Sequence, residues 1–289
     1  MYYVLYNPIS GGGRGGEELD HIKSLTSEDA KIFKVTDIED YKSFIESLSS
    51  DDVLVLSGGD GTINRFANNI ADADIKCPIY YYASGTGNDF LFDIGNDKKG
   101  QLIHLNQYIK DLPTVEVKGE TYRFINGVGY GIDGYCCEEG DRLRAISTKP
   151  VDYTAIAIKG LLFKYKPKKA TVTVDGVTKE YKKVWIAPTM NGRCYGGGMI
   201  PTPDQDRLNS ERTVSLMVFH GSGKLRTLML FPSIFKGEHV KHTKYVDVLV
   251  GKEITVKYDA PSPLQIDGET VVGVSEYTVR SAALVASKK

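Results

Sequence analysis

Short apolar runs, separated by stretches with helical spacing, make up the first part of the chain. The run at residues 53–56 has no polar member, and such a run is typical of a strand that a parallel sheet buries on both faces. This alternation predicts an α/β domain with a parallel sheet and right-handed crossovers over residues 1–117. Strands are expected at residues 2–6, 31–35, 53–56, 78–83 and 114–117, and helices at residues 17–25, 38–48, 62–70 and 101–112. Thr36 is the expected N-cap of the second helix, because Glu39 completes a capping box with it.

From about residue 118 the pattern changes to many short apolar runs with turn residues between them. Asp175-Gly176 is a hairpin signal between two such runs. Strands are expected at residues 122–127, 170–174, 177–181, 184–189, 214–219, 246–250, 254–258, 270–274 and 278–284, and helical spacing at residues 150–163 and 225–235. This pattern favours an antiparallel β-sandwich, so residues 118–289 are expected to form a second domain.

Three glycine-rich polar loops follow strands of the first domain, at residues 7–16, 57–62 and 84–90. The carboxyl ends of parallel strands meet at one edge of a sheet, and ligands of such sheets bind there. A glycine turn that leads into a helix also presents backbone N–H groups, which suit phosphate. A tight strand-to-helix turn or a flexible surface loop explains any one of them, but three loops on one edge favour a phosphate-binding site.

Asp60 is unusual at the centre of the second loop, because phosphate-binding amides seldom surround a carboxylate. Its presence makes sense if it acts through a metal ion or if it orders the loop. The sequence leaves both roles open.

Composition describes an ordinary globular protein. The 289 residues are 41% hydrophobic and 25% charged, with a net charge of −1, so no overall field attracts nucleic acid. The four cysteines lack paired metal-ligand spacing and are expected as reduced thiols. No signal-peptide pattern opens the chain, and no apolar stretch approaches the roughly 18 residues of a membrane span. We therefore expect a soluble, cytoplasmic protein.

Six motifs in a fixed order carry a family resemblance. Those in the first domain are Asn7-Pro8-Ile9-Ser10-Gly11, Gly58-Gly59-Asp60-Gly61-Thr62 and Gly85-Thr86-Gly87-Asn88-Asp89-Phe90. Those in the second are Gly129-Tyr130-Gly131-Ile132-Asp133, Tyr195-Gly196-Gly197-Gly198-Met199 and Gln265-Ile266-Asp267-Gly268-Glu269. Together they resemble the signatures of diacylglycerol kinase catalytic domains, the lipid kinase branch of a superfamily that includes sphingosine, ceramide and, more distantly, NAD kinases.

The resemblance implies ATP and Mg²⁺ as cofactors, with the nucleotide in a cleft between the α/β domain and the β-sandwich. It implies that Glu269 is the general base with Asp267 beside it, and that Asp60 acts at the magnesium-bound nucleotide. Such chemistry suits phosphoryl transfer, which needs charge neutralisation and a carboxylate that accepts a hydroxyl proton. A plain hairpin is the alternative for residues 267–269. The implied nucleotide-binding residues are Asn7, Ser10, Gly11, Thr36, Gly58, Gly59, Gly61, Thr62, Asn64, Arg65, Gly85, Thr86, Asn88 and Asp89.

The leading expectation for the reaction is transfer of the γ-phosphoryl group of ATP to diacylglycerol, which gives phosphatidic acid. A sphingoid base or a soluble NAD-like molecule is an alternative acceptor, and a catalytically silent nucleotide- or lipid-binding regulator is a third alternative. Residues 208–212, Leu-Asn-Ser-Glu-Arg, motivate the silent regulator, since relatives with an accessory magnesium site carry Asp-Asp-Gly there. Arg65 also stands where many relatives carry Glu.

The helix expected at residues 150–163 mixes apolar residues with lysines, and more lysines follow at residues 164–169. It fits either a basic amphipathic face on anionic lipid or a core helix with a solvated rim. A second basic cluster spans residues 236–244. Peripheral contact with the membrane that holds the lipid acceptor is therefore one expectation, and the sequence leaves open whether the protein is a homodimer.

Overall fold

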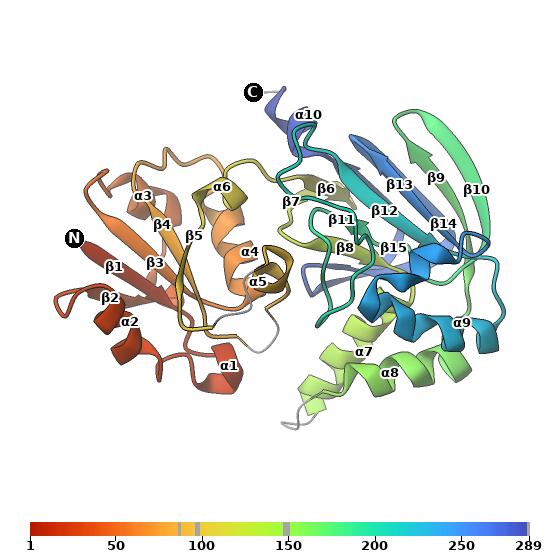
Figure 1. Cartoon of the computed structure of the whole chain (residues 1–289), viewed down its shortest axis with the longest axis horizontal. Coiled ribbons are helices and arrows are strands. Elements are labelled where there is room, and N and C mark those ends of the chain that lie inside the picture. Colours follow the sequence, from red (N-terminus) through yellow and green to blue (C-terminus); the bar gives the residue numbers. More distant parts are fainter. Residues whose placement is uncertain (86–87, 96–98, 147–150, 288–289) are drawn as a thin grey trace. The chain divides into compact units, whose positions relative to one another are not determined.

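The computed structural model describes residues 1–85, 88–95, 99–146 and 151–287. They form two compact units, Met1–Asp111 and Leu112–Lys289, each with its own sheet (Figure 1). Within the described ranges, no helix combines the length and the apolar character that crossing a bilayer requires.

The first unit is built on a mostly parallel sheet with the strand order β2-β1-β3-β4-β5. The first three pairs of neighbours are parallel, and β5 runs antiparallel to β4. The predicted α/β domain is confirmed. The strands are β1 Tyr2–Tyr6, β2 Lys31–Lys34, β3 Val53–Gly58, β4 Ile79–Ala83 and β5 Leu102–His104. The helices are α1 Ser10–Gly13, α2 Leu19–Leu25, α3 Tyr41–Glu46, α4 Asp60–Asn69, α5 Asp89–Asp93 and α6 Asn106–Ile109.

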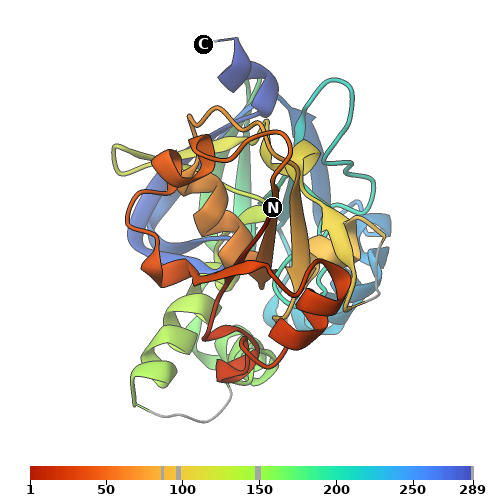
Figure 2. The same cartoon turned by 90° about the vertical axis from the view of Figure 1, so that its left-hand side faces the viewer.

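Helices cover both faces of this sheet (Figure 2). Val4 of β1 and Val55 of β3 pack with Ile22 of α2 in one buried cluster. Tyr3, the neighbour of Val4, makes an edge-on ring contact with Phe44 of α3. Because successive side chains of a strand point to opposite faces, α2 and α3 lie on opposite sides of the sheet. Loops, and not these two helices, follow the carboxyl ends of β1, β3 and β4.

The helix predicted for residues 101–112 is wrong in its first half. Leu102 and His104 instead pair with Tyr82 and Tyr80 as strand β5, and only α6 is helical. Pairing with β4 gives the backbone N–H and C=O groups of β5 hydrogen-bond partners that lie far away in the sequence, so the local pattern does not reveal the strand.

The N-cap prediction for Thr36 is also wrong. Thr36 lies within a 3₁₀ helix, Val35–Asp37, and α3 begins later, at Tyr41. The N-cap is Asp40, whose Oδ1 accepts a hydrogen bond from the backbone N–H of Ser43 at 3.0 Å. Aspartate is a strong N-cap residue, and Asp40 caps α3 in place of Thr36, which lies four residues earlier.

The second unit is an antiparallel, sandwich-like β domain, as predicted. Its strand order is β13-β12-β11-β8-β14-β15-β6-β7, and β9 pairs with both β10 and β14. The register of β14 shifts between Lys257 and Ser262, so its first half pairs with β9 and its last residues with β8. The strands are β6 Thr114–Val117, β7 Glu120–Arg123, β8 Gly127–Tyr130, β9 Lys168–Val174, β10 Val177–Val184, β11 Thr189–Met190, β12 Val214–Phe219, β13 Val246–Gly251, β14 Glu253–Ile266 and β15 Glu269–Arg280.

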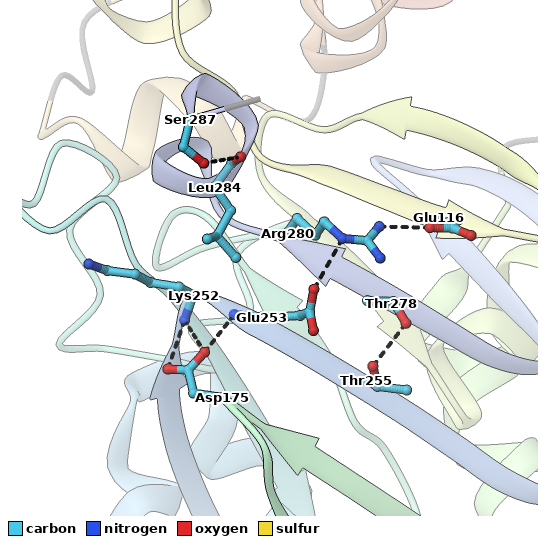
Figure 3. A network of polar contacts seen from close by, with 9 residues as sticks. All are labelled: Glu116, Asp175, Lys252, Glu253, Thr255, Thr278, Arg280, Leu284 and Ser287. Carbon is cyan, nitrogen blue, oxygen red and sulfur yellow. Dashed lines mark hydrogen bonds and ion pairs between the residues drawn. The ribbon is translucent and has the colours of Figure 1, made fainter. Parts of the chain in front are cut away.

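Strand β6 belongs to this second sheet, whereas the sequence analysis placed it at the end of the first domain. It pairs antiparallel with β15, and Arg280 at the end of β15 adds side-chain contacts to this pairing. Its guanidinium donates to Glu116 of β6 at 2.7 Å and to Glu253 of β14 at 3.1 Å (Figure 3). The compact units therefore divide at Asp111, while the pattern change lies near residue 118.

The predicted hairpin at Asp175-Gly176 is present. Both residues have positive φ, 47° and 84°, as a type I′ turn requires. The Asp175 carboxylate also accepts hydrogen bonds from the backbone N–H groups of Lys252 and Glu253, which ties the turn to the start of β14 (Figure 3).

The longest described helix, α7, was not predicted from the sequence. Glycines obscure its pattern, because they are poor helix formers. A Cβ at Gly134 would lie 2.0 Å from the carbonyl oxygen of Pro263 in β14, so packing against the sheet requires glycine there. The helices are α7 Ile132–Ile146, α8 Tyr153–Lys159 with a π-helical extension Gly160–Lys164, α9 Lys224–Leu230 with a 3₁₀ extension Phe231–Lys236, and α10 Ala282–Ala286.

Candidate functional site

The three glycine-rich loops of the first unit meet at the carboxyl ends of β1, β3 and β4. The Asn7 side chain donates from Nδ2 to Thr62 Oγ1 at 2.9 Å, joining the first loop to the second. The hydroxyl of Ser10 lies 3.0 Å from that of Ser84, joining the first loop to the third. Ser57 donates to the same Ser84 hydroxyl at 3.2 Å. The structure thus brings the three loops together through direct side-chain contacts.

Close backbone approach explains why these loops carry glycine. A Cβ at Gly58 would lie 2.3 Å from Thr62 Oγ1, and one at Gly85 would lie 2.7 Å from the Cα of Gly59. Gly11 has a φ of 61°, a conformation that glycine adopts without strain. Gly59 differs, because the nearest atom to its Cβ position is 3.5 Å away. Packing at Gly58 and Gly85 and the positive φ of Gly11 therefore favour glycine, whereas the described residues leave room for a Cβ at Gly59.

The backbone turns at Gly59 into α4, whose N-cap it is. Glycine has no capping side chain, so the N-cap offers no side-chain acceptor to the first N–H groups of this ten-residue helix; of these, the N–H of Thr62 bonds to the Gly59 carbonyl oxygen at 2.9 Å. The positive end of the helix dipole adds to the attraction for an anion. This local structure suits a phosphate group.

Asp60 lies at the start of α4 and contacts the start of α5. Its Oδ2 accepts a hydrogen bond from the backbone N–H of Asp89 at 2.8 Å, and its Oδ1 accepts one from Phe90 at 3.3 Å. The Asp60 carboxylate thus satisfies the first two N–H groups of α5, which is favourable because these groups have no acceptor within their own helix. Of its two expected roles, loop ordering has direct contacts in the structure, and the metal role stays a prediction.

The remaining predicted nucleotide residues lie in different places. Asn64 is buried within α4 and Arg65 is exposed on it. Asn88 donates to the carbonyl oxygen of Gly85 at 3.1 Å and so shapes the third loop. Thr36 is exposed in the turn after β2. Thr86 lies outside the described residues.

A cavity of about 420 Å³ opens beside the first and third loops. Gly11, Ser84 and Gly85 line it together with charged and aromatic side chains that the sequence analysis did not select. These further lining residues are Arg14, Glu17, Glu18, His21, Tyr82 and Lys99.

Three of the cavity residues form one hydrogen-bonded chain. Tyr82 donates to Glu18 Oε2 at 2.7 Å, and His21 Nδ1 lies 2.8 Å from the same tyrosine oxygen. Burial and the neighbouring Glu18 carboxylate raise the pKa of Tyr82 above its ordinary value of 10. One signal in the sequence could have found this chain of residues. Glu18 and His21 are three residues apart, so a helix at residues 17–25 places them on one side, and both contact Tyr82 at the end of β4.

In the second unit, Asp267 fastens the turn between β14 and β15. Its φ is 45°, and Gly268 follows with a φ of 94°. Its carboxylate accepts hydrogen bonds from the backbone N–H groups of Ile125, Asn126 and Gly127, the last two at 2.8 and 2.9 Å. Asp267 thus holds the chain that enters β8.

A second carboxylate, which is buried, supports the same turn. Asp133 Oδ2 accepts a hydrogen bond from Gln265 Nε2 at 3.0 Å, and Gln265 Oε1 accepts one from the backbone N–H of Gly268 at 2.6 Å. Burial raises the pKa of Asp133 to about 6, although the hydrogen bond from Gln265 opposes the rise. A Cβ at Gly129 would lie 1.4 Å from Asp133 Oδ2, so glycine there makes room for the carboxylate.

Glu269 stands at the first position of β15, next to this supported turn. It is exposed on its own unit and lies across from Ile266 in the strand register. An exposed carboxylate on a turn that Asp267 and Gln265 hold in place can act chemically as a proton acceptor.

The loop that departs from the acidic pattern of relatives is built around a buried arginine. Arg207 is 6% exposed and donates to Asn126 Oδ1 at 3.1 Å and to the carbonyl oxygen of Ile125 at 3.3 Å. Asp206 accepts a hydrogen bond from the backbone N–H of Leu208 within the turn itself. Through the Arg207 guanidinium, this loop therefore contacts Ile125 and Asn126, which Asp267 also holds.

Comparisons with known proteins agree with this fold and these loops. The family profile described as the diacylglycerol kinase catalytic domain matches residues 1–116. The profile described as the YegS C-terminal NAD kinase beta sandwich-like domain matches residues 126–284, more than half of the chain. A diacylglycerol kinase from Mycobacterium tuberculosis is 25% identical over 250 residues, which cover 82% of this chain and 79% of that protein.

Two solved structures share the fold. A diacylglycerol kinase from Bacillus anthracis superposes with a TM-score of 0.60 at 17% identity, covering 98% of this chain and 94% of that one. Yeast NADH kinase complexed with NADH superposes with a TM-score of 0.51 at 11% identity, covering 97% and 78%. The solved structures show the fold alone, and the family match places the chain among kinases, which are phosphotransferases. Within that class, the chain belongs to the diacylglycerol kinase catalytic-domain family, and the resemblance of its motifs is confirmed.

Proposed function

We propose that this protein is an ATP-dependent lipid kinase that phosphorylates the hydroxyl group of diacylglycerol, forming phosphatidic acid and ADP. The observation that carries the proposal is the joining of three glycine loops by Asn7, Ser10 and Ser84 at one edge of the parallel sheet. Family membership supports the reaction class. A lipid acceptor also implies a role in phospholipid synthesis, with the protein in the cytoplasm and in peripheral contact with a membrane.

The ATP phosphates bind the backbone of the three loops and the first turn of α4. Gly58 and Gly59 bring the main chain close to the phosphate path, and Asn7 holds the Thr62 hydroxyl beside it. Backbone N–H groups at a helix start suit this anion. Binding here uses fixed dipoles that need no rearrangement during the reaction.

Mg²⁺ fits this site as a companion of the nucleotide. Among the side chains that the structure describes, no group of three or more His, Cys, Asp or Glu residues is arranged to hold a metal ion. Magnesium commonly binds one or two carboxylates together with substrate phosphates, and Asp60 at the start of α4 supplies such a carboxylate. Bound there, the ion would supply charge neutralisation to the phosphates.

Glu269 accepts the proton of the acceptor hydroxyl as the hydroxyl oxygen forms its bond to the γ-phosphorus. The bond between that phosphorus and the β–γ bridging oxygen breaks, and ADP leaves with the electron pair. Asp267 and Gln265 keep the turn in place beside Glu269. General-base catalysis by a positioned carboxylate typically accounts for about 10²–10⁴-fold in rate.

The acceptor is tested with purified protein, labelled ATP and Mg²⁺. Vesicles carrying diacylglycerol, vesicles carrying sphingosine, and soluble NAD are offered in parallel, and labelled product is separated by chromatography. We expect labelled phosphatidic acid alone. Product from sphingosine or NAD changes the acceptor, and ATP binding without product from any acceptor favours a silent regulator.

Glu269→Gln is the decisive variant for the mechanism. It preserves the size and hydrogen-bonding capacity of the side chain but removes its basicity, so turnover should fall by about 10²–10⁴-fold. ATP affinity, measured by calorimetry, should stay unchanged because the nucleotide is assigned to the loops of the first unit. Glu276→Gln, an exposed change on the same strand, is the matched control. Wild-type turnover in Glu269→Gln contradicts the proposed base.

A further inference from the structure

Two oppositely charged side chains hold the segment that enters β8, residues 125–127. Asp267 accepts hydrogen bonds from all three backbone N–H groups of this segment. Arg207 donates to the carbonyl oxygen of Ile125 at 3.3 Å and to Oδ1 of Asn126 at 3.1 Å. The backbone N–H of Asp267 in turn donates to the carbonyl oxygen of Gly127 at 3.1 Å. The position of the segment and the position of the turn at Asp267 therefore depend on each other.

The guanidinium of Arg207 is a permanent charge in a buried place. Arg207 is 6% exposed, and both Ile125 and Asn126 are buried as well. An arginine side chain stays protonated at every pH that a folded protein meets, and its planar fork can serve two acceptors at once. Burial raises the cost of leaving such a donor or its acceptors without partners. Arg207 therefore fixes the segment more firmly than an exposed arginine would.

Neutral side chains close the loop that carries Arg207. Gln205 donates from Nε2 to the carbonyl oxygen of Thr213 at 3.0 Å. Asn209 donates from Nδ2 to the carbonyl oxygen of Asp206 at 2.7 Å, and its Oδ1 accepts a hydrogen bond from the backbone N–H of Thr213 at 3.0 Å. These amide groups bridge the two ends of the loop, which holds its shape through hydrogen bonds of the chain itself.

The carboxylates of this loop do not form a metal site. Asp206 accepts a hydrogen bond from the backbone N–H of Leu208 at 2.9 Å, Glu211 forms an exposed ion pair with Lys252 at 3.2 Å, and Asp204 is exposed. In the part of the chain that the structure describes, no three His, Cys, Asp or Glu side chains gather to hold a metal ion. The guanidinium already places a positive charge in this loop, and like charges repel. The accessory magnesium ion that the acidic pattern of relatives implies therefore does not fit here.

We propose that Arg207 is a positioning residue of the phosphoryl transfer, and that its guanidinium takes the structural role of an accessory magnesium ion as a fixed cation of the chain. Arg207 anchors the loop to residues 125 and 126, and Asp267 binds the same two residues. Glu269 follows Asp267 by two positions, at the start of β15. The effect on turnover rests on the proposed function, whereas the hold on the segment and the independence from an accessory metal do not.

Amide hydrogen exchange of Arg207→Ala tests the hold on the segment without any nucleotide or acceptor. Peptides that cover residues 124–128 and 265–269 should exchange at least about tenfold faster than in the wild type, because the guanidinium no longer restrains them. Guanidinium chloride at a non-denaturing millimolar concentration should restore slow exchange, since the ion fits the space that the side chain leaves. Arg142→Ala, which removes an exposed arginine of the same unit, is the control and should change neither peptide.

Arg207→Lys is the second variant, for the case that Arg207→Ala does not fold. It keeps the charge but loses the planar pair of donors, so the same two peptides should exchange faster than in the wild type. Guanidinium should have no effect on it, because the lysine side chain fills the space. Wild-type exchange in either folded variant overturns the proposal.

Magnesium alone is the probe for the accessory metal. Nucleotide-free wild type and the double variant Asp206→Asn, Glu211→Gln are titrated with magnesium chloride in a calorimeter, and thermal unfolding of both is recorded in magnesium and in EDTA. We expect the two proteins to behave alike, and the Tm of the wild type to be the same in both solutions. Magnesium binding that the double variant loses, or a wild-type Tm that EDTA lowers and magnesium restores, overturns the assignment.

Turnover of Arg207→Ala separates positioning from a purely structural role. Its kcat should fall by at least about tenfold, since small displacements of reacting groups are costly, while its ATP affinity stays unchanged. Guanidinium should restore part of the kcat, as it restores slow exchange. Faster exchange with wild-type kcat overturns the positioning role. Wild type without turnover on any acceptor contradicts the proposed function alone, because the exchange and magnesium measurements still decide the role of Arg207.

Discussion

At the scale of single residues, the glycines of the three loops serve different purposes. Gly58 and Gly85 are required by packing, because a Cβ at either would collide with Thr62 or Gly59. Gly59 itself adopts an extended backbone, with φ −107° and ψ −173°, and among the described residues the atom nearest to its Cβ position is the Cα of Gly85 at 3.5 Å. A side chain at Gly59 is compatible with the fold, so we expect it to affect the binding of a ligand at the start of α4.

We expect Gly59→Val to fold and to weaken ATP binding by at least about tenfold, which corresponds to about 1.4 kcal/mol. A β-branched side chain accepts the extended backbone, but its methyl groups project into the phosphate path. Calorimetry with ATP and thermal unfolding are measured on the same sample. Gly85→Ala is the contrasting variant, since its Cβ would lie 2.7 Å from the Cα of Gly59 and should cost about 1–3 kcal/mol of stability. Normal ATP affinity in folded Gly59→Val contradicts the nucleotide site.

At the scale of elements, Asp60 connects α4 to α5 and so fixes the third loop relative to the second. Both of its oxygens accept backbone hydrogen bonds, from Asp89 and Phe90. An amide in its place has one acceptor and one donor, and the donor would face a backbone N–H. Loss of this connection should loosen the loop and lower the stability of the first unit.

Asp60→Asn should therefore lower the free energy of unfolding by about 1–3 kcal/mol, the usual cost of leaving a buried donor without its acceptor. Urea unfolding measures this, with the exposed Asp74→Asn as control. The magnesium dependence of turnover tests the second role at the same position. A higher magnesium requirement supports the metal role, and lower stability with an unchanged requirement leaves loop ordering alone. Wild-type stability contradicts the ordering role.

At the scale of the whole molecule, the two units have separate cores, and a titrating group in one affects the unfolding of that unit. Asp133 is the clearest case, because burial raises its pKa from the ordinary 3.8 to about 6. Between these values the folded unit holds a proton that the unfolded chain releases. Its stability therefore falls as pH rises from about 4 to about 6, and the contribution is fully present only below pH 4.

The two pKa values of Asp133 differ by about 2, so the change approaches about 3 kcal/mol. Urea unfolding of the second unit is measured from pH 4 to pH 7.5. Asp133→Asn should remove the fall in this window, and the exposed Asp204→Asn should retain it. An equal fall in wild type and Asp133→Asn contradicts the assignment.

The sequence by itself determined the features that a few consecutive residues decide. The unbroken run before Gly58 predicted β3, and Asp175-Gly176 predicted the hairpin between β9 and β10. The alternation of elements predicted the sheet edge where the three glycine loops meet. In each case the signal is a local conformational preference, of an apolar run or of a residue that tolerates positive φ, and it acts on neighbouring residues.

Only the tertiary structure decided where distant segments meet. Helix α7 was hidden because Gly134 is present for contact with Pro263, more than a hundred residues away, and not for helix propensity. Strand β6 joins the second sheet through its pairing with β15 and the contact of Arg280 with Glu116. Asp267 holds residues 125–127 by backbone hydrogen bonds, and Lys224 donates to the carbonyl oxygen of Leu162, which lies in a helical segment far from it in the sequence. Backbone partners, close packing and burial depend on chain segments that no local pattern contains, so they are settled only when the chain is folded.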